Sequence, residues 1–334
     1  SGDRSDEVQR ARELGVASYL RKPVKQSELF DAIVASLGVD ATEAEDASPF
    51  AAAFDPKTIN LPPMRVLLVE DSIVNQKLAL GLLNRWGHSV TVASNGVEAV
   101  LQVSQSEFDF ILMDVQMPEM DGLEATRRIR VREDQHRSEG VADRHVPIIA
   151  MTAHAMKGDR ETCLAAGMDA YVSKPVRSWQ LLEEIAAFFP GCVSGSASDE
   201  ASTDPTSDSD SQSRKDRQWK IDWPAALKVV NGDRELLREI AQAFIEESRE
   251  IMPQLRTALA EGDKTTAGRL AHTMKASFRT IGVAAAHDLA LACEQAAKGG
   301  QIEVISDRLP ELAAVTEKVC EQLAGFIDSG RVPS

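Results

Sequence analysis

The sequence has no apolar run near the roughly 18 residues that a membrane-spanning helix needs, so we expect a chain that is not inserted in a membrane. It is also short of positive charge. Its 37 Lys and Arg residues against 52 Asp and Glu residues leave a net charge of −15, which argues against nucleic acid or an anionic membrane surface as the main partner. A glycine-rich ATP-lid signature is missing too, so no ATP-dependent kinase domain is expected within these residues.

Cysteine is scarce, and the sequence contains no C-x-x-C pair of the kind that indicates a redox or metal site. Widely separated cysteines favour reduced thiols and a cytoplasmic location. The length of 334 residues and the hydrophobic fraction of 43% predict two or three domains with cores of their own. The cysteines are Cys163, Cys192, Cys293 and Cys320.

Two apolar runs in the middle of the chain end in acidic residues. The run DFILMDVQMPEMDG, residues 109–122, places Asp114 just before a Pro/Gly turn, and MRVLLVED, residues 64–71, ends in Glu70 and Asp71. In a parallel sheet such ends meet at one edge, where α/β proteins place their chemistry. Three carboxylates close together repel one another by several kcal/mol unless a hard cation lies among them. The sequence therefore predicts a Mg²⁺ site.

Two further apolar runs end in residues suited to a phosphoryl group. VPIIAM leads into Thr152, and AYVS leads into Lys174, which is followed by a proline. A hydroxyl can donate a hydrogen bond to a phosphoryl oxygen, and an ammonium can balance its charge. Helix-like stretches separate the runs, so we expect five strands alternating with five helices in a doubly wound parallel sheet. The predicted helices are approximately 74–86, 97–105, 123–132, 160–166 and 178–189.

These motifs, taken in order, resemble a response-regulator receiver domain over residues 63–190. The resemblance implies a flavodoxin-like strand order and an aspartyl phosphate formed on Asp114. It also implies that Thr152 is the switch hydroxyl, Tyr171 the switch aromatic and Lys174 the lysine of the Lys-Pro pair. The Mg²⁺ ligands that it implies are Glu70 or Asp71, Asp114 and the carbonyl of Gln116.

The first residues repeat the end of this domain. GVASYLRKPV, residues 15–24, aligns with GMDAYVSKPV, residues 167–176, at a constant offset of 152. We interpret residues 1–37 as the truncated C-terminal piece of a first receiver, and the chain as the C-terminal part of a longer protein. Residues 38–62 are predicted to be a linker. Residues 191–217, rich in Ser and Asp, are predicted to be a disordered linker because they have too little apolar surface to repay ordering.

Residues 218–328 change to a helical period. Leu236, Leu237, Ile240 and Phe244 recur at intervals of three and four, which is typical of an amphipathic helix. Further helices are predicted over residues 284–298 and 302–327. Four or five helices without strand signals predict an all-α antiparallel bundle.

His272 lies off the apolar stripe of its helix. At 100° per residue, Arg269, Lys275 and Arg279 fall on its side, so we expect a neutral imidazole amid three cations that attract a phosphoryl group. Small neighbours at positions 268 and 276 predict an accessible ring.

The sequence AHTMKAS around His272 resembles a histidine phosphotransfer (HPt) domain. The resemblance implies that His272 is the phosphohistidine and that Lys275 helps to hold the phosphate. Ala276 departs from the family, which usually has glycine there.

Together the two resemblances predict the tail of a hybrid sensor histidine kinase that works in a phosphorelay. An upstream histidine kinase domain gives the phosphoryl group to Asp114, His272 receives it, and a downstream response regulator receiver takes it on. The alternative is an interaction module that docks without phosphate. A haloacid-dehalogenase-like phosphatase is disfavoured, because such enzymes need a second acid where this chain has Gln116.

Overall fold

The computed structural model describes residues 61–140, 144–152, 157–189, 219–330 and 332. The predicted receiver piece 1–37 and the predicted linker 191–217 lie outside the described residues, as does all but the end of the linker 38–62. The described residues fold into a sheet domain and a helical domain, which belong to one compact unit.

The sheet domain is built on five parallel strands in the order β2-β1-β3-β4-β5. The flavodoxin-like doubly wound sheet predicted from the sequence is confirmed. β1 and β3 are neighbours, with Val69 beside Met113, so their carboxyl ends open at the same place. The strands are β1 (Arg65–Val69), β2 (Ser89–Ala93), β3 (Phe110–Asp114), β4 (Ile148–Thr152) and β5 (Ala170–Ser173).

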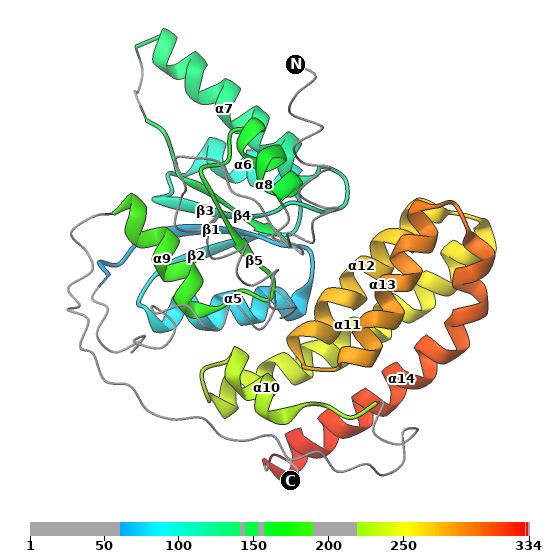
Figure 1. The fold of residues 1–334 in the computed structure, drawn as a ribbon. Coiled ribbons are helices and arrows are strands. Elements are labelled where there is room, and N and C mark those ends of the chain that lie inside the picture. The colour runs from blue at the N-terminus through cyan, green and yellow to red at the C-terminus, as the bar shows by residue number, and fades with distance from the viewer. Residues whose placement is uncertain (1–60, 141–143, 153–156, 190–218, 331, 333–334) are drawn as a thin grey trace, which may run out of the picture. The chain divides into compact units, whose positions relative to one another are not determined.

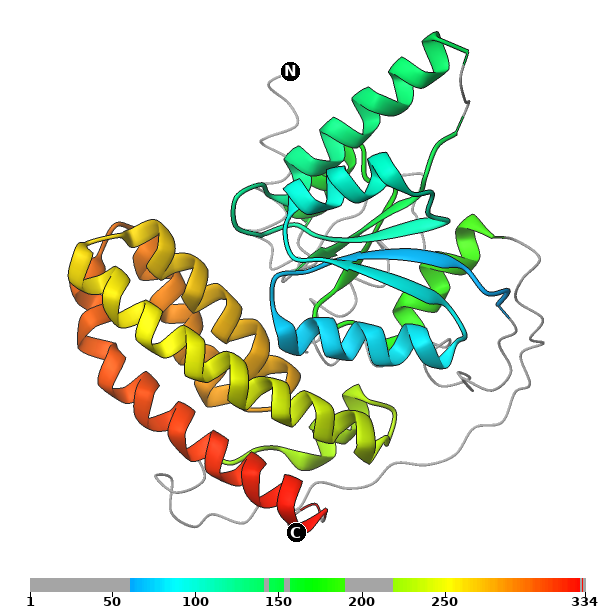
Figure 2. The ribbon, with the colours of Figure 1, turned by 180° about the vertical axis from the view of Figure 1, so that it is seen from behind.

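Helices alternate with these strands and cover both faces of the sheet. α5 and α9 lie on one face, while α6, α7 and α8 lie on the other (Figures 1 and 2). Every residue of β3 and β4 is buried, as expected for strands covered on both sides. The helices are α5 (Ile73–Arg85), α6 (Gly96–Gln105), α7 (Gly122–Ser138), α8 (Lys157–Ala165) and α9 (Ser178–Phe188).

One predicted boundary is wrong: α7 continues six residues beyond Arg132, the end expected from the sequence. The apolar periodicity stops there, but the straight-chain residues Glu133, Gln135 and Arg137 still favour a helix. The helix ends only before Gly140, whose φ of +69° suits glycine.

Local capping fixes where two helices begin at the carboxyl edge of the sheet. The Ser72 side chain accepts a hydrogen bond from the Asn75 amide at the start of α5, and Asp121 does the same for Glu124 in α7. Gly122 allows the turn after β3 to close, because a Cβ atom there would collide with the Asp114 carbonyl oxygen. The chain therefore turns into a helix after each of the two acidic strand ends.

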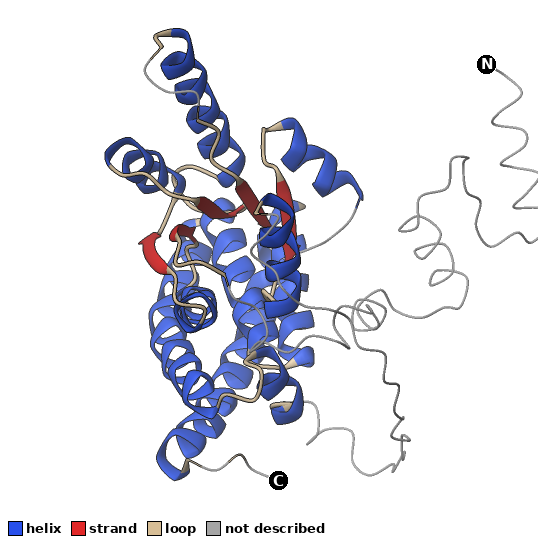
Figure 3. Cartoon of the chain, turned by 90° about the vertical axis from the view of Figure 1, so that its left-hand side faces the viewer, coloured by secondary structure: helices blue, strands red, loops and turns tan. Residues whose placement is uncertain are grey.

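The second domain consists of helices joined by loops, with no strand among its described residues (Figure 3), which confirms the predicted bundle. Its core includes Phe244 and Phe278, whose ring centroids are 5.4 Å apart. Gly262, with φ +73°, ends α11 in the left-handed conformation and Asp263 caps α12. The helices are α10 (Trp223–Val229), α11 (Arg234–Glu261), α12 (Lys264–Thr280), α13 (Ala284–Lys298) and α14 (Ile302–Ser329).

Within the compact unit, α5 of the sheet domain packs against α11 and α12 of the bundle. None of the described helices has the length and apolar character needed to cross a membrane.

Candidate functional site

Three carboxylates meet at the carboxyl ends of β1 and β3. Glu70, Asp71 and Asp114 each place one oxygen within 4.8 Å of the others. Glu70 and Asp114 are only 1% and 2% exposed, whereas Asp71 is half-buried. The cluster predicted from two separate apolar runs is therefore assembled by the pairing of their strands.

Lys174, at the end of β5, lies against this cluster. Its Nζ atom is 2.7 Å from Glu70 Oε2 and 2.8 Å from Asp114 Oδ2. Burial disfavours a charged ammonium, but the charges of Asp114 and Glu70 outweigh burial and raise the pKa of Lys174 above its ordinary value. Lys174 therefore stays protonated and neutralises one of the three acidic charges.

Lys174 alone does not neutralise all three carboxylates, so the pKa values of two of them rise. Burial is the main cause that raises the pKa of Asp114 to about 8; the charges of Glu70 and Asp71 add to it, and the charge of Lys174 opposes it. Burial and the charge of Glu70 likewise raise the pKa of Asp71 to about 6. Carboxylate oxygens are the ligands that Mg²⁺ prefers, and a divalent cation would keep these acids ionised. The residues present fit such an ion.

The other residues predicted for this site lie on β4, on β5 and in the loop after β3. The amide of Gln116 donates to Asp114 Oδ1 at 3.2 Å, so the loop after β3 folds over the carboxylate. Thr152 is buried at the end of β4, and its carbonyl accepts from the Lys174 amide at 2.7 Å. Tyr171 is half-buried on β5, and the Arg160 guanidinium carbon lies 5.5 Å from its ring centroid.

The second centre lies on α12 of the bundle. His272 Nδ1 is 3.0 Å from Glu294 Oε1 on α13, and Lys275 Nζ is 2.7 Å from Glu294 Oε2. Burial disfavours the ionised form of Glu294, but hydrogen bonds from His272, Lys275 and Lys298 outweigh burial and hold the pKa of Glu294 well below its usual range. Because an ionised carboxylate only accepts, Nδ1 carries the hydrogen and Nε2 keeps a free lone pair.

The environment expected for His272 is partly wrong. The side chain is buried, with 8% of the residue exposed, rather than open on a polar face. Burial is the main cause that lowers the pKa of His272; the charge of Lys275 adds to it, and the bond to Glu294 opposes it. The prediction considered only the residues of α12 itself. In the structure α12 also packs against α13 and against α5 of the sheet domain, and burial becomes the main influence on the imidazole.

Gly268 has a different role from the one expected. A Cβ atom at this position would lie 2.9 Å from the Ala297 Cβ atom. The missing side chain therefore lets α13 approach α12 closely, which brings Glu294 to the imidazole.

Glu294 is the site residue that sequence reasoning missed. It lies 22 residues beyond His272, on the next helix. The sequence offers only a glutamate four residues before Lys298, a common pattern on exposed helices. Nothing in a single sequence shows which faces of α12 and α13 meet.

The Glu294→Gln variant should lower the pKa of His272 further, because the neutral amide no longer stabilises the imidazolium. NMR titration of the imidazole C–H resonances measures this shift. We expect phosphoryl acceptance to slow about tenfold, the effect of losing one hydrogen bond to a charged group. Exposed Glu303 provides the control, and an unchanged titration in Glu294→Gln would contradict the assigned contact.

The two centres influence each other electrostatically. The charge of Lys174 lowers the pKa of His272, and the charge of Arg269 lowers the pKa of Asp71, although burial dominates both groups. Hydrogen-bonding contacts of Ser277 with Ser72 and of Thr280 with Asn75 place α12 beside the first turn of α5, which follows Glu70 and Asp71.

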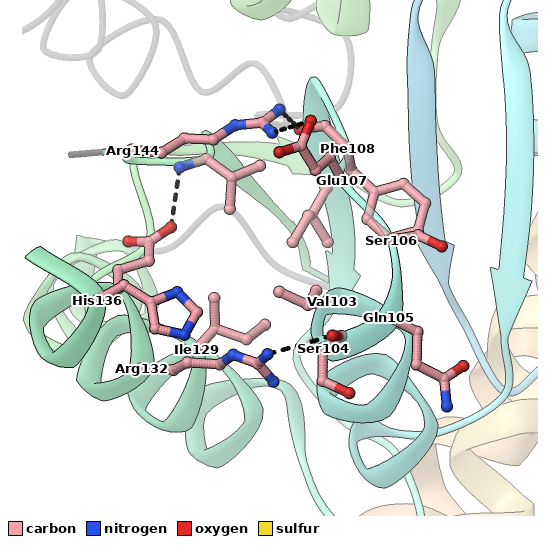
Figure 4. Close-up of a pocket in the computed structure, with 13 residues that line it drawn as sticks. Val103, Ser104, Gln105, Ser106, Glu107, Phe108, Ile129, Arg132, His136 and Arg144 are labelled. Atoms are coloured by element: carbon pink, nitrogen blue, oxygen red, sulfur yellow. Dashed lines mark hydrogen bonds and ion pairs between the residues drawn. The ribbon is translucent and has the colours of Figure 1, made fainter. Parts of the chain in front are cut away.

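A pocket of about 290 Å³ lies elsewhere, between α6 and α7 at the amino-terminal edge of the sheet. Figure 4 shows Arg132 and Arg144 at this pocket. Both guanidinium groups already form hydrogen bonds within the protein: Arg132 donates to the Ser104 carbonyl and Arg144 donates to the Phe108 carbonyl. The pocket is separate from the acidic cluster, and we assign no chemistry to it.

Comparison with protein families identifies both domains. Residues 66–186 match the response regulator receiver domain, and residues 239–324 match the Hpt domain. These matches lie inside the segments 63–190 and 218–328 assigned from the sequence. The chain therefore carries a receiver and an HPt domain, the domains of phosphorelay signal transduction.

Several curated proteins are similar to the chain. The signal transduction histidine-protein kinase BarA of Shigella flexneri is 30% identical over 263 residues, which cover 77% of this chain and 26% of BarA. Histidine kinase 3 of Arabidopsis thaliana is 41% identical over 138 residues, which cover 37% of this chain and 13% of that protein. The chain thus spans about a quarter or less of the length of these relatives.

Solved structures resemble parts of the chain. The receiver domain of the sensor histidine kinase PA1611 from Pseudomonas aeruginosa PAO1, which has a magnesium ion in its active site cleft, is 40% identical with a TM-score of 0.33; the match covers 38% of this chain and 97% of that one. The Saccharomyces cerevisiae complex of Ypd1 with the Ssk1 receiver domain matches at 33% identity and a TM-score of 0.36, covering 38% of this chain and 88% of the matched one.

Proposed function

We propose that this chain relays a phosphoryl group from Asp114 of its receiver to His272 of its HPt domain. The observation that carries the proposal is the position of Lys174. Its ammonium lies 2.8 Å from Asp114 Oδ2, and its charge also acts on His272. A fixed cation beside the acidic acceptor, whose charge also reaches a neutral imidazole, suits the transfer of a phosphoryl group from one to the other.

Two displacements at phosphorus make up the relay. A carboxylate oxygen of Asp114 attacks the phosphorus of an upstream phosphohistidine, forming a P–O bond while the P–N bond of the donor breaks. The Nε2 atom of His272 then attacks the acyl phosphate, and Asp114 leaves as a carboxylate. Lys174 balances charge on the phosphoryl oxygens, while Glu294 holds the imidazole in the tautomer whose Nε2 is free.

Mg²⁺ is the cofactor that the acidic cluster fits. Glu70, Asp71 and Asp114 would hold it, together with the carbonyl of Gln116 as the family resemblance implies. Bound there, the ion would neutralise charge on the phosphoryl oxygens.

The switch roles of Thr152 and Tyr171 belong to the same proposal. Thr152 ends the strand beside Asp114, where its hydroxyl can turn to a newly bound phosphoryl oxygen. Tyr171, half-buried on the next strand, can then pack inward. On the bundle, Lys275 would steady the phosphoryl group on His272.

The proposed partners are a histidine kinase domain upstream and the receiver of a separate response regulator downstream. The parent protein would be a histidine kinase, as the names of BarA and of the Arabidopsis relative suggest, and of the hybrid type because the chain carries a receiver and an Hpt domain. The described residues supply phosphotransfer only. The cytoplasmic location remains a prediction from the cysteine pattern.

A labelling time course tests the relay. The chain is incubated with Mg²⁺ and radiolabelled acetyl phosphate, and samples are treated with alkali or acid. We expect alkali-labile label, typical of an aspartyl phosphate, to appear first and alkali-stable, acid-labile label on His272 to follow. Chelation of Mg²⁺ should prevent both.

The His272→Gln variant separates the two steps. A carboxamide side chain is not a nucleophile at phosphorus, so the first label should persist and the second should be missing. His136→Gln, on α7 of the sheet domain, is the matched control. Alkali-stable label in the His272→Gln chain would show that another residue receives the phosphoryl group, and the proposal would fail.

A further inference from the structure

A buried glutamate on α11 belongs neither to the acidic cluster nor to the site around His272. Glu247 is only 5% exposed, yet the neighbouring Glu246 on the same helix is exposed. Its Oε2 atom accepts a 2.5 Å hydrogen bond from the Ser277 hydroxyl on α12. Burial raises the pKa of Glu247 to about 7, and hydrogen bonds from Ser277, Ser72 and Ile73 oppose this rise.

The other oxygen of Glu247 reaches across to the sheet domain. Oε1 accepts from the Ile73 amide at 2.7 Å. Ile73 is the first residue of α5, so its amide is one of the N-terminal donors that have no partner within a helix. The positive end of the helix dipole also favours a carboxylate at this place.

Two neighbouring contacts align the same helix end. The Ser277 hydroxyl lies 3.4 Å from the hydroxyl of Ser72, the residue that caps α5. One helical turn further along each helix, the Thr280 hydroxyl donates to Asn75 Oδ1 at 3.1 Å. The first turn of α5 is therefore matched by three polar side chains of the bundle.

This position is expensive for an acid that serves only to hold the bundle together. A buried carboxylate costs free energy unless charged or strong donors meet it. Within the bundle Ser277 supplies one donor, and the sheet domain supplies the amide of Ile73. Without the sheet domain, Oε1 would lose that donor.

We propose that Glu247 is a specificity-determining residue of the relay, which recognises a receiver by capping the helix that follows its acidic pair. The partner that it fits is a receiver with a free first amide and a small hydroxyl residue at that helix start, as Ser72 and Ile73 provide. The cap fixes α5 immediately after Glu70 and Asp71, and so sets the acidic cluster against His272. This inference rests on the proposed relay for its kinetic consequence, but the contact itself can be tested without it.

The test compares Glu247→Ala with Glu246→Ala in the full chain. The first readout is hydrogen exchange of the Ile73 amide in the unphosphorylated chain, which does not depend on phosphotransfer. We expect Glu247→Ala to exchange this amide at least tenfold faster, while amides in the middle of α5 keep their protection. Glu246→Ala should leave the Ile73 amide unchanged.

The second readout is the rate at which label moves from Asp114 to His272 after a pulse of radiolabelled acetyl phosphate. Loss of one hydrogen bond to a charged group should slow this step about tenfold in Glu247→Ala, with the labelling of Asp114 unchanged. Glu247→Gln keeps the volume and one acceptor oxygen, so it should fold even if the alanine variant does not, and it should transfer at an intermediate rate.

Unchanged protection of Ile73 in both Glu247 variants would overturn the inference, and so would transfer at the wild-type rate. If wild-type chain never labels His272, the proposed relay fails, while the exchange of Ile73 still decides whether Glu247 caps α5.

Discussion

The Asp114→Asn variant should carry no label on either domain after incubation with Mg²⁺ and radiolabelled acetyl phosphate. An amide at position 114 is not a nucleophile, so labelling should fall on the order of 10²-fold or more. Label on His272 should disappear with it, because in the proposed relay the imidazole receives its phosphoryl group through Asp114. Alkali-labile and alkali-stable counts, measured on the same samples, check both losses.

Asp109→Asn provides the control for this variant. Asp109 lies just before β3, at the opposite end of the strand from Asp114, and accepts a hydrogen bond from the Arg65 amide. Its replacement should leave both labels in place. If Asp114→Asn still gained alkali-labile label, then Glu70 or Asp71 would be the acceptor and our assignment of Asp114 would be wrong.

Lys174→Met should cause the largest loss of stability of any single substitution at the acidic cluster. Methionine fills similar space but removes the ammonium that lies between Glu70 Oε2 and Asp114 Oδ2. Breaking a buried ion pair from one side costs about 3–5 kcal/mol. Urea denaturation of the receiver transition, without divalent cations, measures this loss.

The loss should depend on pH in a defined direction. Burial already raises the pKa of Asp114 to about 8, and without Lys174 this pKa should rise further. A raised carboxyl pKa favours the folded state at low pH and loses that contribution as pH rises through the folded value. Lys174→Met should therefore be most destabilised at alkaline pH and least at acidic pH.

Two further variants make the stability prediction specific. Lys77→Met changes an exposed lysine on α5 and should leave the urea midpoint unchanged. Adding Asp114→Asn to Lys174→Met should restore part of the stability, because one of the unpaired carboxylates is gone. Equal midpoints for Lys174→Met and Lys77→Met would contradict a structural role for the ion pairs.

Local patterns in the sequence determined the elements and most of the acidic site. Apolar runs that end in acid, hydroxyl or lysine predicted four strand ends, because burial on both faces of a parallel sheet leaves a continuous apolar signal. The helical spacing of apolar residues in α11 predicted the bundle, because a helix that is buried on one side keeps its apolar residues on that side. The end of α7 was missed, since its last turns have no apolar stripe, and so was the short helix α10.

The tertiary structure alone decided which side chains meet across elements. Glu294 reaches His272 because α13 packs closely on α12 at Gly268, and the pKa of His272 falls chiefly through burial rather than through the cations of its own helix. Glu247 likewise becomes a cap for α5 only where α11 meets the sheet domain. The physical reason is the separation along the sequence of the residues that interact. Periodicity and strand ends are properties of neighbouring residues, whereas burial and hydrogen bonding between elements depend on surfaces that come together only when the chain is folded.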